Sequence, residues 1–177
     1  MRLETERLVL RPWREGDEED LVRHANNRNV WINLRDAFPH PYTLEDAREW
    51  IKRAVYAPQP PHNLAIEHAG EAIGSVGIVP MTDIARFTAE VGYWIGEAFW
   101  GRGLATEALS RFTLYVFDTF RFERLEAWVF DTNPASGRVL EKAGYQYEAT
   151  LQRTAFKDGR FHDCRVYVRF RPCADGP

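Results

Sequence analysis

The sequence predicts a mixed α/β domain whose sheet is mostly antiparallel, and three patterns lead to this fold class. Short apolar runs within residues 64–95 are joined by tight turns, which is typical of an antiparallel meander. A strand, a helix and a further strand follow one another over residues 88–130. Alternating residues within 145–170 flank a turn and predict a terminal β-hairpin. Together these elements favour one sheet flanked by helices.

The N-terminal part predicts one strand and two helices. Alternation over residues 7–13 indicates an edge-like strand, and Gly16-Asp17 leads into a short helix. The segment 26–41 has little periodicity, so we expect a loop with a helical turn. Thr43 and Asp46 form a capping-box-like pair that begins a second helix. Prolines at positions 58, 60 and 61 end that helix.

Six strands and two helices are expected in the rest of the chain. The strands are predicted at 64–66, 72–79, 88–95, 125–130, 145–151 and 161–170. The strand at 125–130 is predicted to be fully buried. One helix carries an apolar stripe over 104–117. The other begins at the N-cap Asn133, has Pro134 in its first turn and is closed by Gly144.

Length and composition predict a single domain over residues 1–171, followed by a short tail at 172–177. The chain has 177 residues, of which 45% are hydrophobic, and its formal net charge is −3. Acidic and basic residues are interleaved, so we expect neither nucleic-acid binding nor a membrane-surface patch. Cys164 and Cys173 make no disulfide framework, and no signal peptide or membrane span is evident. These features favour a cytoplasmic protein.

The five histidines lack the paired spacing of metal ligands, so no metal is expected. A homodimer formed through the exposed sheet edge or the terminal hairpin is a further expectation.

A glycine-rich turn at Trp100-Gly101-Arg102-Gly103-Leu104-Ala105 joins a strand to a helix, and it predicts a phosphate site. Glycines allow backbone angles that bring successive N–H groups onto one anion, and the helix N-terminus adds its own unpaired N–H groups. The alternative is a plain turn without a ligand. A Walker A loop is excluded because no Gly-Lys pair occurs in the chain. A dinucleotide fingerprint fits poorly, because Thr106 stands where its third glycine belongs.

This turn resembles the Gln/Arg-x-x-Gly-x-Gly/Ala motif of the GNAT N-acetyltransferase superfamily, with Trp100 in place of the first residue. Three further segments resemble the RimJ/RimL-like branch and come in its order, so that the resemblance covers nearly the whole chain. They are Leu3-Glu4-Thr5-Glu6-Arg7-Leu8-Val9-Leu10-Arg11, Phe38-Pro39-His40-Pro41-Tyr42-Thr43-Leu44-Glu45-Asp46-Ala47, and the stretch Asn133 to Tyr145.

The resemblance implies the GNAT fold, with about seven strands in a mixed sheet that splays between the fourth and fifth strands. It also implies acetyl-CoA as the acyl donor and CoA as the product. We expect the backbone N–H groups from Arg102 to Thr106 to hold the pyrophosphate, and the Arg102 side chain to add charge. The other cofactor contacts implied are Trp94, Ile95, Gly103, Leu104, Ala105, Asn133 and Ser136. Two of these contacts have alternatives. Trp94 could be a core residue, and Asn133 could act only as a helix cap.

Two residues are candidates for proton transfer. Glu90 shares a strand face with Gly92 and Trp94, and a carboxylate in an apolar strand is costly to bury unless it is paired or used. We therefore expect it to act as general base, and an ion-paired surface glutamate is the alternative. Ser136 resembles a proton donor to the thiolate. Many members of the family use a tyrosine on this helix, but here Val139, Leu140 and Glu141 occupy that region.

The acceptor site is expected to draw on Trp31, Phe38, Tyr42 and residues near 81–87, whose aromatic rings could equally belong to the core. The acceptor is expected to be a primary amine of a small molecule or of a protein N-terminus. Neither cysteine belongs to a visible catalytic constellation, so direct attack is favoured over a covalent intermediate. Two alternatives are a non-catalytic acyl-CoA-binding module and an enzyme that uses a longer acyl-CoA.

Overall fold

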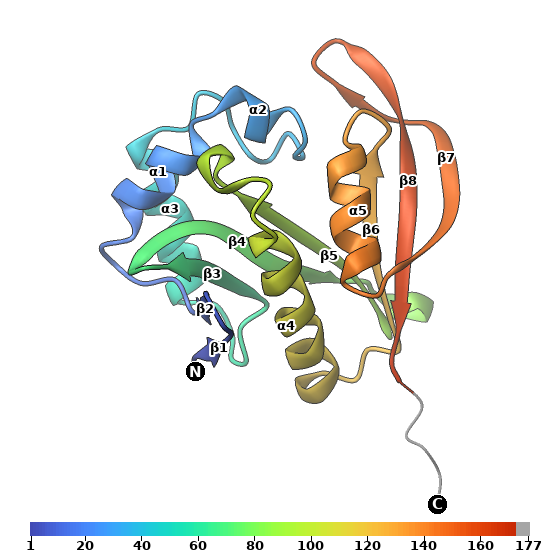
Figure 1. Cartoon of the computed structure of the whole chain (residues 1–177), viewed down its shortest axis with the longest axis horizontal. Coiled ribbons are helices and arrows are strands. Elements are labelled where there is room, and N and C mark those ends of the chain that lie inside the picture. Colours follow the sequence, from blue (N-terminus) through green and yellow to red (C-terminus); the bar gives the residue numbers. More distant parts are fainter. Residues whose placement is uncertain (173–177) are drawn as a thin grey trace, which may run out of the picture.

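The computed structural model describes residues 1–172, which form eight strands in one sheet and five α-helices (Figure 1). The spatial strand order is β1-β2-β3-β4-β5-β6-β8-β7. The strands are β1 Leu3–Glu4, β2 Val9–Arg11, β3 Asn63–His68, β4 Glu71–Pro80, β5 Thr88–Ile95, β6 Arg124–Phe130, β7 Gln146–Lys157 and β8 Arg160–Phe170. The helices are α1 Glu18–Ala25, α2 Arg28–Trp31, α3 Leu44–Val55, α4 Leu104–Thr119 and α5 Pro134–Lys142, with short 3-10 turns at Asp83–Ala85 and Glu97–Phe99.

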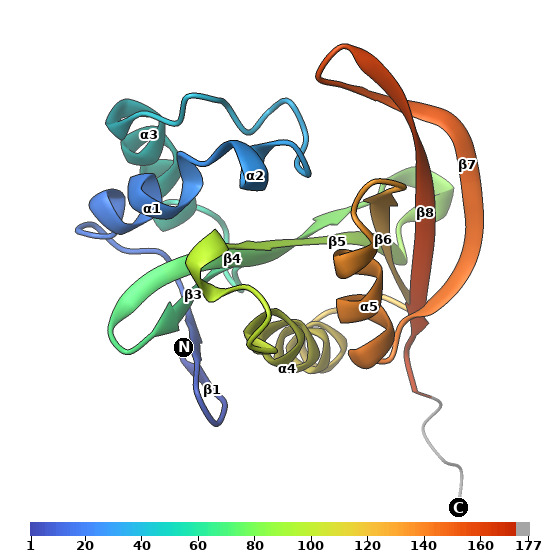
Figure 2. The same ribbon diagram turned by 45° about the horizontal axis from the view of Figure 1, so that its top comes forward.

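The helices cover opposite faces of the sheet. Helices α1 to α3 lie on one face, whereas α4 and α5 lie on the other (Figure 2). The hairpin of β7 and β8 is long and rises beyond the sheet on the side of α1 to α3, so that its tip lies level with the segment around α2. All neighbouring strands are antiparallel except β5 and β6, which the crossover through α4 makes parallel. The mixed fold class is therefore confirmed.

Local sequence signals fix the ends of several elements. Helix α3 begins at a complete capping box, in which Thr43 and Asp46 satisfy each other's backbone N–H groups. Helix α5 begins with the Asn133 side chain accepting from Ser136 N at 3.2 Å. Gly144, at φ +83°, closes α5 in the left-handed conformation that glycine adopts without strain.

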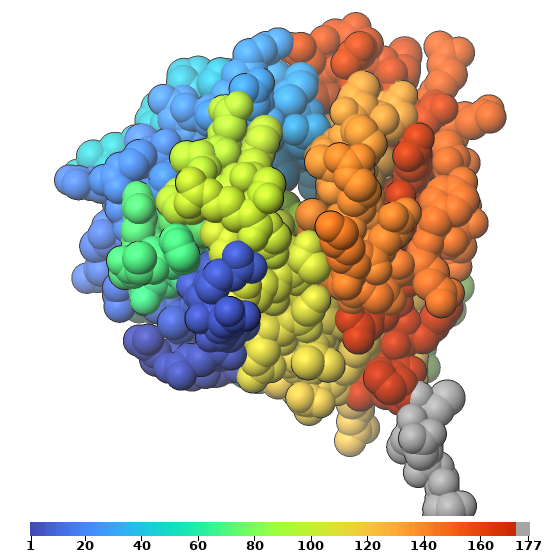
Figure 3. Space-filling model, viewed as in Figure 1, coloured from blue at the N-terminus to red at the C-terminus, as the bar shows by residue number. Residues whose placement is uncertain are grey.

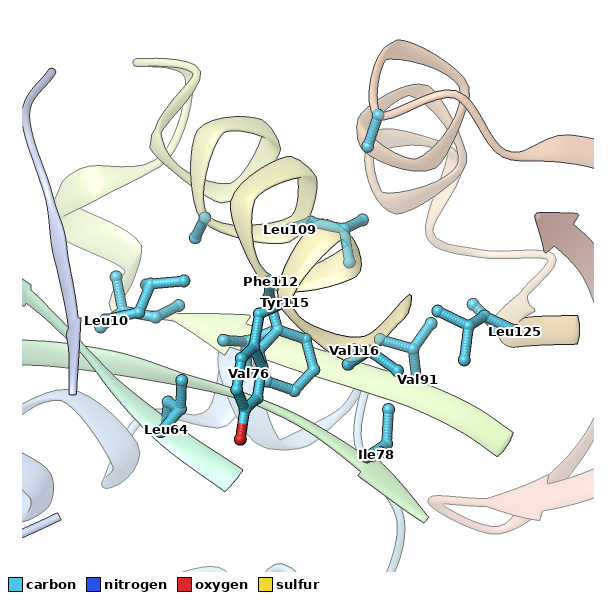
Figure 4. Close-up of a cluster of buried hydrophobic side chains, with 14 of the residues drawn as sticks. Leu10, Leu64, Val76, Ile78, Val91, Leu109, Phe112, Tyr115, Val116 and Leu125 are labelled. Carbon is cyan, nitrogen blue, oxygen red and sulfur yellow. The ribbon is translucent and has the colours of Figure 1, made fainter. Parts of the chain in front are cut away.

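The main core lies between α4 and the sheet. Phe112 on α4 is fully buried and packs toward Val76 on β4, Val91 on β5 and Leu125 on β6 (Figure 4). Truncating a buried phenylalanine of this kind to alanine costs about 3–5 kcal/mol. A second, smaller cluster lies under α1 and α3 on the opposite face, and Trp94 packs against it. Both faces of the central strands are therefore covered.

Strands β5 and β6 pair over only three residues and then separate. Their parallel register joins Thr88 to Arg124, Ala89 to Leu125 and Glu90 to Glu126, whereas β5 runs on to Ile95 and β6 to Phe130. Beyond Glu90, the edge of β5 that faces β6 has no strand partner among the described residues. This splay opens the middle of the sheet.

Four sequence predictions need correction. The sheet has eight strands because Leu3–Glu4 pairs with β2, and β2 covers only Val9–Arg11 of the strand predicted at 7–13. Because of the extra first strand, the predicted splay falls between β5 and β6. The strand at 125–130 is not buried throughout, since the Trp128 side chain is 44% exposed where the sheet opens.

The N-terminal loop with its helical turn, the meander, both long helices and the terminal hairpin are confirmed. The predicted tail at 172–177, apart from Pro172, and Cys173 lie outside the described residues. Within residues 1–172, none of the helices is long and apolar enough to cross a bilayer. The same part of the chain holds no cluster of His, Cys, Asp and Glu side chains suited to a metal ion. Strand β7 is one edge of the sheet, and a homodimer through it stays a prediction.

Candidate active site

A cavity of about 880 Å³ opens where β5 and β6 separate. Its walls come from the loop after α2, from α3, from β5 and β6, from the start of α5, and from the tip of the terminal hairpin. Figure 3 shows the surface hollowed between the light-blue segment around α2 and the orange α5. Of the predicted site residues, five line this cavity: Phe38, Tyr42, Glu90, Trp94 and Ser136.

The glycine loop lies between β5 and α4 and has the geometry of an anion site. Gly101 and Gly103 have φ values of +75° and +76°, which other residues adopt only with strain. Within residues 1–172, no backbone N–H from Gly101 to Thr106 donates a hydrogen bond to the protein. The Trp100 indole donates to the Ile95 carbonyl at 2.8 Å and so ties the loop to the end of β5.

Side chains around the loop hold its shape. Arg7 donates from Nη1 to the Arg102 carbonyl at 2.8 Å and pairs with the Glu107 carboxylate through Nη2 at 2.7 Å. Thr5 Oγ1 donates to the same carboxylate at 2.6 Å. The Arg102 guanidinium lies 5.5 Å from the centre of the Phe99 ring and is otherwise exposed. Among the described residues, the loop therefore presents the exposed Arg102 guanidinium beside a row of backbone N–H groups without a protein acceptor.

Not every predicted cofactor contact offers its side chain to the cavity. Ile95 is buried in the main core, and its carbonyl already accepts from Trp100. Leu104 is also buried in the core, so only its backbone N–H remains available for a ligand. The side-chain oxygen of Asn133 caps α5, which is the capping role named above as the alternative. Their contacts with CoA stay predictions.

A tyrosine that sequence reasoning missed lies against Ser136. Tyr93 Oη is 2.8 Å from Ser136 Oγ and also donates to the Ser136 carbonyl at 3.1 Å. Burial raises the pKa of Tyr93 well above its ordinary value, although the hydrogen bond with Ser136 acts in the opposite direction. Both residues line the cavity, so a protonated phenol and a hydroxyl meet at the opening between β5 and β6.

Glu90 is ion-paired. Its carboxylate accepts from Nη2 of Arg35, which belongs to the loop after α2 and whose side chain is 65% exposed. Both partners line the cavity. Glu90 is thus ion-paired, as the alternative interpretation predicted. The pair lines the cavity and does not lie on an outer face of the sheet. An exposed pair of this kind is worth at most about 1 kcal/mol, so a ligand can separate it at little cost.

Aromatic rings form the wall of the cavity on the α1 to α3 face. Phe38 lies 4.9 Å from Tyr42 and 5.5 Å from Trp94, measured between ring centres. Burial raises the pKa of Tyr42 to about 12, so its phenol stays protonated at neutral pH. These three rings combine the predicted acceptor contacts Phe38 and Tyr42 with Trp94, which was expected at the cofactor. Trp94 thus packs with a predicted acceptor ring, and its contact with the cofactor stays a prediction.

Trp31 has a different environment and is not among the lining residues. Its ring packs between Lys157, whose Nζ lies 3.8 Å from the ring centre, and His40. Lys157 comes from the hairpin and also pairs with Asp36 at 2.9 Å. These contacts bind the hairpin tip to the segment around α2 and close one side of the cavity. A direct contact of Trp31 with the acceptor stays a prediction, and so does one from residues 81–87, which are not among the lining residues either.

Cys164 also lines the cavity, from β8. Burial raises the pKa of its thiol, and the charges of Asp131, Asp163 and Glu90 raise it further. Because the thiolate is the nucleophilic form, these surroundings make Cys164 a poor nucleophile. The geometry favours an attack that does not pass through this cysteine.

Sequence patterns gave little warning of Arg7, Arg35 and Tyr93. Arg35 lies in a segment without periodicity, and Tyr93 reads as an ordinary strand aromatic. Arg7 stands in a segment that resembles the RimJ/RimL-like branch, and this was the one available signal for its place beside the glycine loop.

The chain is similar to known acetyltransferases in sequence and in fold. Residues 7–146 match the family model described as an acetyltransferase (GNAT) domain. An uncharacterized N-acetyltransferase of Bacillus subtilis, YoaA, is 32% identical over 96% of this chain and 97% of its own. The ribosomal-protein-serine acetyltransferase of Escherichia coli is 28% identical over 93% of this chain and 93% of its own. The fold matches a solved structure of RimL, a ribosomal L7/L12 acetyltransferase in complex with CoA, with a TM-score of 0.83 at 20% identity, over 96% of this chain and 98% of that one.

Proposed function

The chain belongs to the GNAT acetyltransferase family, and we propose that it transfers an acetyl group from acetyl-CoA to a primary amine by direct attack. The acceptor is the amine of a small molecule or of a protein N-terminus. The observation that carries the proposal is the glycine loop, whose unpaired N–H groups from Gly101 to Thr106 lie at the N-terminus of α4. The opening between β5 and β6 beside it provides room for a thioester and an amine.

The loop fits the pyrophosphate of CoA. Its two left-handed glycines leave the N–H groups accessible, and space is open around the position of a Cβ at Gly101. The dipole of α4 and the Arg102 guanidinium both favour an anion at this place. Acetyl-CoA supplies the activated acetyl thioester. Residues of the chain are proposed to deprotonate the amine, stabilise the oxyanion and protonate the thiolate.

Glu90 is the proposed general base. Its carboxylate lines the cavity and remains an acceptor, because its ion pair with the 65% exposed Arg35 side chain is weak enough for an incoming amine to replace. An ammonium group that enters beside Glu90 loses its proton to the carboxylate, directly or through water, and the neutral amine becomes the nucleophile. The free edge of β5 beyond Glu90 offers backbone N–H groups for the developing oxyanion.

Ser136 and Tyr93 are proposed to return a proton to the departing thiolate. Tyr93 is held protonated by burial, and its hydroxyl lies 2.8 Å from that of Ser136. If Ser136 gives its proton away, Tyr93 can replace it through this hydrogen bond. A strand tyrosine thus stands in for the helix tyrosine that the sequence lacks at 139–141.

Calorimetric titration with acetyl-CoA tests the cofactor site. The wild-type protein should bind, and Gly103→Glu should abolish binding, because it sets a carboxylate against the proposed phosphate position. Gly159→Glu is the matched control, since Gly159 has a similar φ of +79° at the hairpin tip, away from the loop. The proposal fails if wild type does not bind, or if both variants bind as wild type does.

A further inference from the structure

The ion pair between Arg35 and Glu90 presents both signs of charge at the mouth of the proposed acceptor site. Arg35 extends from a loop and its side chain is 65% exposed, whereas Glu90 is fixed on β5 and is 21% exposed. The guanidinium can therefore move while the carboxylate stays in place. A ligand that carries an anion and a cation on neighbouring atoms can replace both contacts. Its anion then binds Arg35, and its cation binds Glu90.

The other charged side chains that line the cavity form interactions of their own or lie near a side chain of opposite charge. Lys157 pairs with Asp36, and Asp46 accepts from Thr43 in the cap of α3. Glu49 and Arg53 lie one helical turn apart on α3 and carry opposite charges. In all, the residues lining the cavity include four carboxylates and three cations. A polycationic acceptor would need several unpaired carboxylates, and this cavity does not supply them.

Arginine is suited to the anionic end of such a ligand. Its guanidinium binds a carboxylate through two parallel N–H donors, and this geometry is more specific than that of a lysine ammonium. Glu90 receives the ammonium and then its proton, which is the role already proposed for it. Because Arg35 and Glu90 are in direct contact, the two charges of the ligand have to be close together, as they are on the α-carbon of an amino acid.

Part of the cavity wall is apolar. Phe38, Tyr42 and Trp94 form one aromatic surface, and Phe130 and Val129 line the cavity from β6. A polar side chain would lose hydration against these rings, whereas an apolar one gains from its burial. The side chain of the ligand is therefore apolar.

We infer that the acceptor is a free α-amino acid with an apolar side chain, whose carboxylate is bound by Arg35 while its amine is deprotonated by Glu90. This inference rests on the proposed acetyl transfer and names its substrate. A peptide N-terminus carries an amide where the free amino acid has its carboxylate, so it leaves Arg35 without an anionic partner. Arg35 thus distinguishes the two classes of acceptor.

Three acceptors with the same benzyl side chain test the inference: phenylalanine, phenylalaninamide of nearly equal size, and phenethylamine, which lacks the carboxyl group. Thiol release from acetyl-CoA gives kcat/KM for each, and rates are compared per unprotonated amine because the three amines differ in basicity. We expect phenylalanine to exceed the other two by about tenfold or more, as expected for a charge-assisted bidentate contact. A similar panel with leucine and leucinamide shows whether the preference follows the carboxylate and not the ring.

Substitution of Arg35 tests its part directly. Arg35→Gln should lower the ratio of kcat/KM for phenylalanine over phenylalaninamide by about tenfold, mainly through KM of the free acid, and Arg35→Lys should restore part of it. Arg48→Gln is the control, because Arg48 is an exposed arginine of α3 that pairs with Glu45. The control should keep the wild-type ratio.

Two results would overturn the inference. One is an amide acetylated as well as the free acid or better. The other is a protein that binds acetyl-CoA and acetylates amines but none of the free apolar amino acids. Failure of the proposed function looks different, because acetyl-CoA then does not bind, or no amine of any class is acetylated.

Discussion

Tyr93 Oη on β5 and Ser136 Oγ on α5 lie 2.8 Å apart, although 43 residues separate them in the chain. They meet because β5 and β6 part beyond Glu90, which lets the start of α5 approach the strand at this point. The pair places two exchangeable protons where the proposed thiolate leaves. It also makes each residue depend on the other.

Removing either hydroxyl should therefore slow turnover. Tyr93→Phe and Ser136→Ala are each expected to lower kcat by about 100-fold while acetyl-CoA affinity changes little, because general acids contribute on this scale. The double variant should be hardly slower than the single ones, since the two groups act as one unit. Steady-state kinetics and calorimetry on the three variants give the result.

A second buried pair provides the control. Thr113 Oγ1 and Tyr145 Oη lie 2.9 Å apart between α4 and the end of α5, and neither lines the cavity. Tyr145→Phe should lower thermal stability and leave kcat unchanged. Equal losses of kcat in Tyr93→Phe and Tyr145→Phe would mean that Tyr93 acts only through packing.

Replacing Glu90 by glutamine should remove the proposed base and keep the shape of the strand. We expect kcat/KM to fall by about 100-fold at neutral pH and to recover partly as the pH rises, because more of the amine is then already deprotonated. Glu126→Gln is the comparison, since Glu126 is the register partner of Glu90 on β6, pairs with Arg124 and does not line the cavity. Similar pH–rate profiles for the two variants would argue against a base at position 90.

Arg7 should matter for the cofactor although it stands far from the loop in sequence. It holds the Arg102 carbonyl at 2.8 Å and the Glu107 carboxylate at 2.7 Å. Arg7→Ala is expected to weaken acetyl-CoA binding by about tenfold, because losing a hydrogen bond to a charged group costs about 1.5–3 kcal/mol and loosens the loop. Calorimetry measures this, with Arg2→Ala as the control, since Arg2 is exposed and lies 3.8 Å from Glu4. An unchanged affinity in Arg7→Ala would remove Arg7 from the site.

Acid should weaken the cap of α3. The hydrogen bond from the Thr43 side chain, with that from the Thr43 backbone, holds the pKa of Asp46 below its usual 3.8. A carboxyl with a lower pKa in the folded state stabilises the protein above its unfolded pKa, and this contribution is lost as the pH falls toward the folded value. Asp46→Asn should thus be less stable than wild type at about pH 7, and the difference should shrink at about pH 3.5.

Denaturant unfolding at both pH values measures that difference. Glu45→Gln is the matched variant, because Glu45 lies in the same first turn and its side chain is 72% exposed. It should show little change with pH. A difference for Asp46→Asn that grows on acidification would contradict the assignment.

Much of the fold and part of the site followed from local sequence signals. Gly101 and Gly103 predict the loop because glycine is the residue that adopts positive φ angles without strain. Asn133 and Pro134 predict the start of α5 because they are typical of the N-cap and the first turn of a helix. The strand pattern singled out Glu90, and the family resemblance pointed to Ser136. These features need no knowledge of distant neighbours.

Other features depend on contacts between distant segments, which periodicity does not reveal. Arg35 meets Glu90 across 55 residues, from a segment whose course is set by Trp31, Lys157 and Asp36 at the hairpin tip. The same contacts explain why Trp31, expected at the acceptor, packs against Lys157. The exposure of Trp128 likewise follows from the splay of the sheet. The sequence pattern could not predict it, because the pattern does not depend on whether a neighbouring strand covers the residue.

A quantitative acetyl-transfer assay, with phenylalanine as acceptor and mass spectrometry of both protein and amine, tests the central claim most directly. Direct attack predicts one acetylated amine for each CoA thiol released, no thiol release without acceptor, and no acetyl group on the protein. Acetyl-CoA binding without acetylation of phenylalanine or any other primary amine would contradict the claim of enzymatic transfer. An acetyl group that appears on Cys164 and passes on to the amine would contradict direct attack.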